Sequence, residues 1–273
     1  MRQDIFHNTL KRYFKGLSLL FFGAFLLLNK NTPCLAEEKW QEHRSTHFII
    51  YYKDAPPDFI QSVDETAEHL YQEITQNLGF YRDKSWTWDQ RAIIYIYQDA
   101  DDYVNSAKQA GWSHGAASTR EKIIRSFPTA HGFVDSTLPH ELGHIIFREF
   151  VGYSVDIPLW FDEGVAMYQE KAKRWGANKA VISAMEKNVF LSLDDLARLK
   201  LTPETERSTV DLFYAEAASI VYYMMTELGQ YRFVHFCRQL KEGKNFEQAL
   251  YDVYTRFKNV DDLNRAWTNY LKR

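Results

Sequence analysis

The spacing of hydrophobic positions predicts a mixed α/β arrangement for the first half of the chain. Residues 47–52 and 91–97 are short runs rich in Ile and Tyr, which are typical of β-strands. Between them, apolar residues recur every three or four positions over Pro57–Leu78, the spacing that places them on one face of a helix. Residues 116–127, with two central isoleucines, predict a further strand or hairpin.

Helical spacing dominates the rest of the chain. A short helix is predicted around Ala100–Ala107, before a loop that contains Gly111 and Gly115. From about Thr137 onward the strand signals stop, and we predict helices with five breaks: residues 152–158, Gly176, residues 202–203, Gly229 and Gly243. No internal repeat or low-complexity linker separates the two halves, so we expect them to share a core or a cleft. The pattern predicts an α+β fold, in which a small mixed β-sheet with helices is followed by an all-helical half.

The first 36 residues have the layout of a secretory signal peptide. Four basic residues within 2–15 precede an uncharged apolar run of 12 residues at 17–28, and Cys34 and Ala36 occupy the two key positions of a cleavage site. An uncleaved membrane anchor is the alternative, but a spanning helix needs about 20 apolar residues. We therefore expect cleavage after Ala36 and export to the periplasm or the exterior. The remaining residues 37–273 are predicted to form one domain, with an α/β half at 37–135 and a helical half at 136–273.

Composition indicates a packed globular protein and excludes one class of partner. Hydrophobic residues make up 45% of the chain and aromatic residues 16%, enough for a sizeable core. The signal segment holds five of the 33 Lys and Arg and one of the 36 Asp and Glu, so residues 37–273 carry a formal charge of 28 minus 35, or −7. With that charge and no long basic run, nucleic acid is not an expected partner. Cys237 is the one cysteine left after cleavage, so we expect a buried thiol and no internal disulfide.

Residues 139–147, Pro-His-Glu-Leu-Gly-His-Ile-Ile-Phe, carry the strongest functional signal. His140 and His144 are four residues apart, so on a helix both imidazoles lie on one face and can bind one metal ion. Glu141 is displaced from this face by about a quarter of a turn, where its carboxylate can accept a proton from a water molecule at the metal. For this helix we expect an N-cap oxygen from residues 135–137 and an end at Gly152.

Glu163 is the predicted third ligand. A tetrahedral catalytic zinc site uses three protein ligands and leaves its fourth position open. Eighteen residues lie between His144 and Glu163. That length lets the first helix end, turn at residues 152–158 and continue as a second helix alongside. This helical hairpin predicts that Glu163 reaches the two histidines.

The combination of His-Glu-x-x-His, 18 residues and then Trp-x-x-Glu-Gly at 160–164 resembles the gluzincin metallopeptidases. In particular, it is similar to the small bacterial peptidase MA-like proteins, which are related to the catalytic domain of the aminopeptidase N group. The resemblance implies a zincin-like fold, with a short mixed sheet above a helical lower half and the active-site helix between them. It also implies that His140, His144 and Glu163 bind zinc and that Glu141 is the general base.

Three further residues are weaker candidates. The resemblance extends from Phe48 to the C-terminus and implies that Tyr214 points at the zinc, where it would stabilise the oxyanion of a peptide carbonyl; simple packing is the alternative for one of 17 tyrosines. Glu170 and Asp162 are candidates to orient the ligand histidines, and exposed helix acids are the alternative. Glu170 ranks first because it follows Glu163 by seven residues, on the same predicted helix face, and matches an acid in the related aminopeptidases.

One motif of the related aminopeptidases is missing. They carry Gly-x-Met-Glu-Asn before the metal-binding helix, and its Glu binds the free amine of the substrate. Here residues 115–124 read Gly-Ala-Ala-Ser-Thr-Arg-Glu-Lys-Ile-Ile, and Glu121 stands at the wrong spacing. We therefore expect an endopeptidase, with the substrate backbone added to an edge strand between Ala116 and Ser126.

Together these features predict an exported zinc metallopeptidase that acts on peptides or proteins. The alternative from another class is a catalytically silent, zinc-stabilised binding or scaffold module of the same fold. Glu141 favours the enzyme, because zinc binding alone does not require that residue. A third alternative is a membrane-tethered partner protein, if the N-terminal segment is retained, and the oligomeric state stays open.

Overall fold

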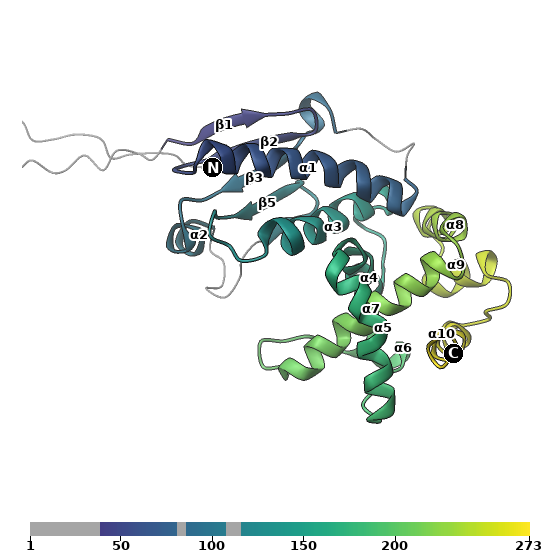
Figure 1. Ribbon diagram of the computed structural model, residues 1–273. Helices are drawn as coiled ribbons and strands as arrows, with labels where there is room; N and C mark the ends of the chain where they lie inside the picture. The colour runs from purple at the N-terminus through teal and green to yellow at the C-terminus, as the bar shows by residue number, and fades with distance from the viewer. Residues whose placement is uncertain (1–38, 81–85, 108–115) are drawn as a thin grey trace, which may run out of the picture. The chain divides into compact units, whose positions relative to one another are not determined.

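A mixed five-stranded β-sheet forms the first half of the computed structural model, which describes residues 39–80, 86–107 and 116–273 (Figure 1). The strands in spatial order are β1 (Gln41–Arg44), β2 (Phe48–Tyr52), β3 (Ala92–Ile96), β5 (Ile123–Ser126) and β4 (Ala116–Ser118). The three central strands are parallel, and β1 and β4 pair antiparallel to their neighbours. The described part of the sheet therefore ends in two antiparallel edge strands, one of which is β4.

One face of the sheet is buried because the register of the strands places apolar residues side by side. Ile50 of β2 lies beside Ile94 of β3, which in turn lies beside Ile124 of β5, and all three side chains are fully buried. The helix α1 (Pro57–Leu78) packs on β2. Its buried residues recur at helical spacing, as the sequence predicted. Figure 1 shows α1 running along the strands and beside the later helix α3.

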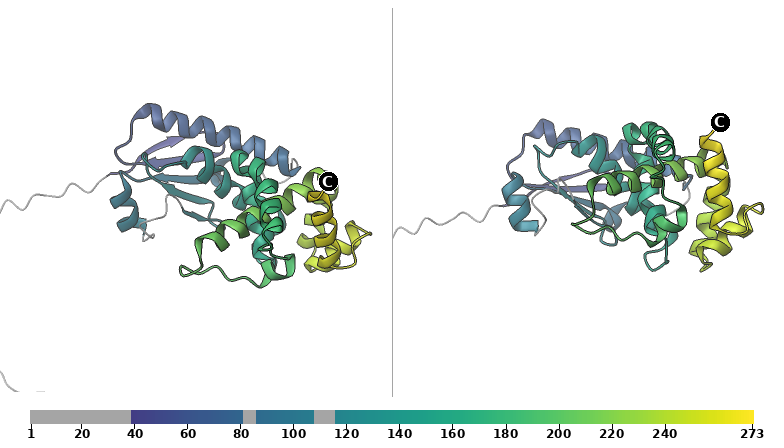
Figure 2. Two further views of the ribbon diagram at one scale, coloured as in Figure 1. Left: turned by 60° about the horizontal axis from the view of Figure 1, so that its bottom comes forward. Right: turned by 90° about the horizontal axis from the view of Figure 1, so that it is seen from below.

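Three short helical segments of the described chain interrupt or follow the strands, and only the last of them leads into the helical half. They are α2 (Ala100–Ala107), the 3-10 turn Trp88–Gln90 and the π-helical turn Phe133–Thr137. The later helices are α3 (Leu138–Val151), α4 (Leu159–Gln169), α5 (Lys171–Glu186), α6 (Leu193–Arg198), α7 (Arg207–Thr226), α8 (Gln230–Lys241), α9 (Phe246–Val253) and α10 (Val260–Leu271). After β5 the described chain contains no further strand, which confirms the predicted α+β fold. Figure 2 shows α2 and the C-terminal helices at opposite ends of this arrangement.

One hydrophobic core runs through both halves. It includes Ile50 in the sheet, Leu142 on α3 and Trp267 on α10, each fully buried. Cys237 on α8 is also fully buried in this core, which confirms the predicted buried thiol, and burial raises the pKa of this thiol. Among the described residues, no helix is both long enough and apolar enough to cross a lipid bilayer.

Two details of the predicted elements are wrong. Gly176 lies inside α5 instead of breaking it. The helix continues there because Ala177, Val181 and Ala184 on one face are buried, which outweighs the propensity cost of one exposed glycine, about 1 kcal/mol. Strand β1, Gln41–Arg44, was not predicted, because its polar residues show no strand pattern and it forms by pairing with β2. The predicted signal segment and the loop glycines Gly111 and Gly115 lie outside the described residues.

Candidate metal centre

Two glycines allow the helices around the candidate site to pack closely. Gly143 on α3 faces α4, and a Cβ atom there would lie 3.0 Å from the Cα atom of Ala166. Gly164 on α4 faces α7, and a Cβ atom there would lie only 2.3 Å from the carbonyl oxygen of Ala217. Each glycine is adjacent in sequence to a predicted ligand, His144 or Glu163. The close approach of α3, α4 and α7 therefore sets where those ligands lie.

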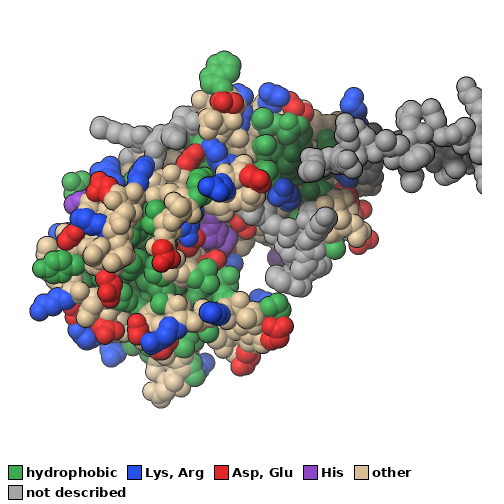
Figure 3. Space-filling view, turned by 180° about the vertical axis from the view of Figure 1, so that it is seen from behind, with side chains coloured by type: hydrophobic (Ala, Val, Ile, Leu, Met, Phe, Trp, Pro, Cys, Tyr) green, Lys and Arg blue, Asp and Glu red, His purple; other side chains and the backbone are tan. Residues whose placement is uncertain are grey.

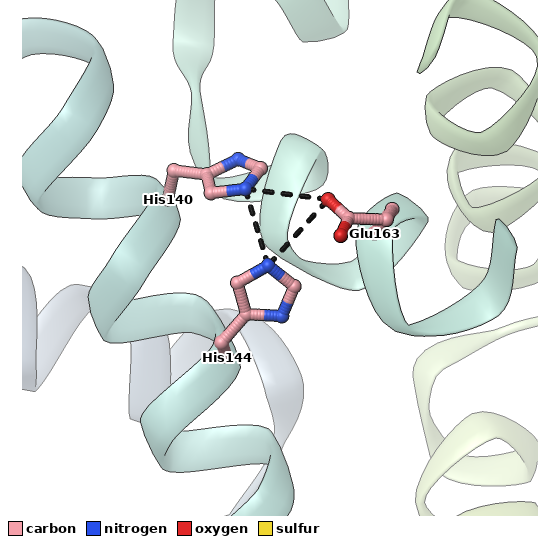
Figure 4. Close-up of side chains that lie close together, drawn as sticks. All are labelled: His140, His144 and Glu163. Carbon is pink, nitrogen blue, oxygen red and sulfur yellow. Dashed lines mark hydrogen bonds and ion pairs between the residues drawn. The ribbon is translucent and has the colours of Figure 1, made fainter. Parts of the chain in front are cut away.

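His140, His144 and Glu163 meet where α3 and α4 come together, and we call them the His–His–Glu cluster (Figure 4). The Nε2 atoms of the two histidines are 3.1 Å apart. The Oε2 atom of Glu163 lies 3.4 Å from Nε2 of His140 and 3.5 Å from Nε2 of His144. The predicted helical hairpin thus brings all three side chains together.

The geometry of the His–His–Glu cluster fits a tetrahedral metal ion. Ligand atoms about 2.0–2.2 Å from such an ion are separated by about 3.3–3.5 Å, close to the 3.1, 3.4 and 3.5 Å found here. Oε2 of Glu163 is buried and has no hydrogen-bond partner in the described structure. Burying a carboxylate oxygen without a hydrogen bond costs free energy unless a bound cation compensates the negative charge. Two imidazole nitrogens and one carboxylate oxygen are a donor set that zinc accepts.

A carboxylate, buried in Glu170 and partly buried in Asp162, holds the far side of each imidazole. Nδ1 of His140 donates a hydrogen bond to Oε1 of Glu170 at 2.9 Å, and Nδ1 of His144 donates to Oδ1 of Asp162 at 3.2 Å. Because both Nδ1 atoms carry the proton in these hydrogen bonds, the Nε2 lone pairs are left to bind a metal ion. Both of the weaker acidic candidates from the sequence therefore contact the histidines.

These carboxylates are fixed by partners that the sequence did not reveal. Arg148 donates two hydrogen bonds to Oδ2 of Asp162, from Nε at 2.8 Å and from Nη2 at 2.7 Å. Ser136 donates from its hydroxyl to Oε2 of Glu170, which also pairs with Lys173 at 2.8 Å. Arg148 follows His144 by four residues, so the same helical spacing that relates the histidines could have identified it.

Two details predicted for these residues are wrong. Glu170 does not continue the helix face of Glu163, because α4 ends at Gln169 and Glu170 has an extended backbone between α4 and α5. Residues 135–137 provide no side-chain cap for α3. The preceding π-helical turn supplies a backbone acceptor instead: the carbonyl of Phe133 accepts from the amide of Leu138, the first residue of α3. This turn leaves the Ser136 hydroxyl available to Glu170.

Burial and charge alter the pKa values of the metal-free cluster. Burial disfavours protonated His144, but the nearby carboxylates of Asp162 and Glu163 outweigh this and raise its pKa to about 10. Burial likewise disfavours ionised Glu163, yet His140 and His144 outweigh it and lower the Glu163 pKa to about 2. The carboxylates around His144 thus favour a positive charge at the His–His–Glu cluster.

Glu141 and Tyr214 complete the surroundings of the cluster. Glu141 lies on the first turn of α3, and burial raises the pKa of its carboxyl group while His140 and His144 oppose the change. Tyr214 is a partly buried residue of α7. Burial and the nearby carboxylates of Glu163 and Glu141 raise the Tyr214 pKa to about 12, so its hydroxyl keeps its proton at neutral pH. Figure 3 shows histidine side chains in a hollow near the middle of one face of the molecule.

We expect Gly164→Ala to destabilise the protein by about 3 kcal/mol, because a backbone oxygen of α7 occupies the space of the new methyl group. Gly176→Ala is the matched control: no atom lies within 4 Å of a Cβ at this exposed helix position, so stability should rise by about 0.5–1 kcal/mol. Urea unfolding of both metal-free variants measures the difference. Equal stabilities would contradict the close α4–α7 contact.

Comparison with known proteins assigns the family. The model of the Peptidase MA superfamily matches residues 81–273, a stretch that holds β3 to β5, the His–His–Glu cluster and every later helix. A search of curated proteins found no match. The family match covers more than half of the chain, and it includes the helices that carry each candidate residue. The chain therefore belongs to the Peptidase MA superfamily, which indicates a peptidase.

Proposed function

We propose that this protein is an exported, zinc-dependent metallopeptidase of the gluzincin type, related to the catalytic domain of aminopeptidase N, that cleaves within peptide chains. The observation that carries the proposal is the His–His–Glu cluster, whose three ligand atoms face one another at 3.1, 3.4 and 3.5 Å. The adjacent Glu141 supplies a partly buried carboxyl group that none of the three ligand positions requires.

His140, His144 and Glu163 would hold the zinc ion. When bound, zinc polarises the carbonyl group of a peptide and lowers the pKa of a water molecule to about 7. Glu170 and Asp162 keep the imidazoles in the tautomer that directs Nε2 to the metal, and such partners typically change metal affinity by about 10-fold to 100-fold. Arg148 and Ser136 in turn keep these two carboxylates ionised and in place.

Glu141 is the proposed general base. A base works best when its pKa lies near the operating pH, and burial moves the pKa of Glu141 upward from that of an ordinary carboxyl group. Its carboxylate accepts a proton from the attacking water and then passes that proton to the nitrogen of the leaving amine. Tyr214 keeps its hydroxyl proton at neutral pH and donates a hydrogen bond to the peptide carbonyl oxygen as negative charge develops there.

The edge strand β4 is the proposed site for the substrate backbone. Strand β4, Ala116–Ser118, pairs on one side with β5 and ends the described sheet on the other, so a peptide can add to it through main-chain hydrogen bonds. This mode of binding needs no free terminus. Glu121 lies exposed in the turn after β4, outside the spacing of the amine-binding motif. These features favour cleavage within a chain.

A digest of a diverse peptide library, with zinc analysis of the same protein sample, tests this proposal. We expect about one zinc ion per chain, as for a single catalytic site, and cleavage of peptides at equal rates whether their N-terminus is free or acetylated. Stepwise removal of N-terminal residues from free peptides alone would instead indicate an aminopeptidase. Bound zinc with no cleavage of any peptide would favour the silent binding or scaffold module.

A further inference from the structure

A pocket of about 350 Å³ lies beside the candidate metal centre. We call it the arginine pocket, and its lining residues are Thr119, Arg120, Arg148, Tyr153, Ser154 and Asp162. Asp162 lines this pocket and also contacts the metal centre, because its Oδ1 atom accepts the hydrogen bond from Nδ1 of His144. Asp162 therefore connects the pocket to the predicted metal ligand His144.

Among the described residues, one of the two arginines of the arginine pocket has no ion-pair partner. Arg148 is occupied: it donates two hydrogen bonds to Asp162 and one to the carbonyl oxygen of Val155 at 3.0 Å. Arg120 is exposed and forms no ion pair with any residue that the structure describes. With two guanidinium groups and one carboxylate, the pocket has a formal excess of one positive charge.

Three of the residues that line the arginine pocket carry hydroxyl groups. They are Thr119, Tyr153 and Ser154. Burial and Glu149 raise the pKa of Tyr153 to about 12, while Arg120 acts in the opposite direction, so the phenol is a hydrogen-bond donor at neutral pH. A guanidinium group with several hydroxyl donors around it matches the acceptor-only oxygens of an anionic group.

The position of the arginine pocket relates it to the peptide path. Thr119 and Arg120 follow β4 directly and lie in its turn to β5. A peptide that is hydrogen-bonded to β4 and extends past Ser118 brings a side chain or a chain end to this turn. The pocket is thus located where a substrate residue close to the cleaved bond can enter it.

We propose that the arginine pocket is a subsite for a carboxylate group of the substrate, held by Arg120 and the three surrounding hydroxyl groups. This inference rests on the proposed peptidase function and adds a substrate class to it: peptides with an acidic side chain near the cleaved bond, or with a free C-terminal carboxylate there. Arg120 is the specificity-determining residue. Arg148 is a positioning residue, since its donors hold Asp162.

Binding to a protein that cannot hydrolyse its ligand tests this subsite separately from catalysis. The Glu141→Gln protein, loaded with zinc, is mixed with a peptide library that contains matched pairs: Glu against Gln at each position, and C-terminal acid against C-terminal amide. Mass spectrometry of the captured peptides then gives the ratio of acid to amide for each pair. We expect a ratio of about ten for one source of carboxylate, as for one charge-assisted hydrogen-bonded pair, and a lower ratio at high salt.

Arg120→Gln in the same protein should remove this preference, so that the ratio falls about tenfold to near one, since the guanidinium donor is lost. Arg238→Gln is the matched control, because Arg238 is an exposed arginine on α8 outside the pocket, and it should keep the ratio. A preference for Glu over Gln would identify an acidic side chain as the ligand, and a preference for acid over amide termini would identify the C-terminus.

The outcomes separate this inference from the proposed function. Equal capture of the acid and amide members of every pair, or no capture at all, overturns the subsite even if the wild-type protein cleaves neutral peptides. A preference for acids that survives Arg120→Gln also overturns it, because recognition would then lie elsewhere. Loss of the preference in Arg120→Gln supports the subsite even where the wild-type protein cleaves nothing, a result that would count against the peptidase alone.

Discussion

Replacing Glu141 with Gln lowers the rate of peptide hydrolysis by about a thousandfold while zinc binding is retained. The expected size follows from the loss of general-base catalysis, which contributes about 10²–10⁴ in rate. Gln has the same shape as Glu, but its amide cannot accept the proton of water. Because burial already raises the pKa of Glu141, a neutral amide costs little at this position, and we expect a melting temperature close to that of the wild type.

The measurement combines hydrolysis rates, zinc content and thermal melting for one sample. Glu247→Gln is the matched control, since Glu247 is an exposed residue in the first turn of α9, and its rate should equal that of the wild type. Cleavage by Glu141→Gln at the wild-type rate would exclude Glu141 as the base. Loss of zinc in this variant would instead make Glu141 a ligand, contrary to the arrangement of the His–His–Glu cluster.

Replacing His144 with Ala lowers zinc affinity by at least about a thousandfold, because one of three protein ligands is lost. Asp162→Asn gives a smaller decrease, about 10-fold to 100-fold, since it weakens only the hydrogen bond that orients His144. Zinc content after dialysis against a weak chelator, measured beside circular dichroism, separates loss of metal from loss of fold.

The control for these variants is His235→Ala. His235 lies exposed on α8, and this variant should bind zinc as the wild type does. Near-stoichiometric zinc in His144→Ala would rule out the His–His–Glu cluster as the metal centre. Equal zinc loss in Asp162→Asn and His144→Ala would show that Asp162 does more than orient the imidazole.

The residues around the histidines show which parts of the site follow from spacing along one helix and which depend on another segment of the chain. His140 and His144 face the same way because they are one helical turn apart, and no distant residue is needed to bring them together. Glu170 is different: its predicted helix face does not exist, and it reaches His140 from the break between α4 and α5. Glu170 therefore contacts a histidine by a route other than the predicted helix face.

Long-range contacts also explain the errors in the predicted secondary structure. Gly176 has low helix propensity, but burial of its helix neighbours keeps α5 continuous. Strand β1 has no apolar alternation of its own and becomes a strand only beside β2. In both cases the contact that decides the structure comes from residues that no short window of sequence contains.

The sequence by itself determined the α+β order of elements, the strands around Ile50 and Ile94, and the three candidate ligands, because periodicity and spacing along a helix act over a few residues. Only the tertiary structure decided how close the helices come at Gly143 and Gly164, because that distance depends on the backbones that face them. It also decided that the turn after β4 and the loop after α3 would together form the arginine pocket. These contacts join segments far apart in the chain, and their energies depend on packing that leaves no repeating pattern in the sequence.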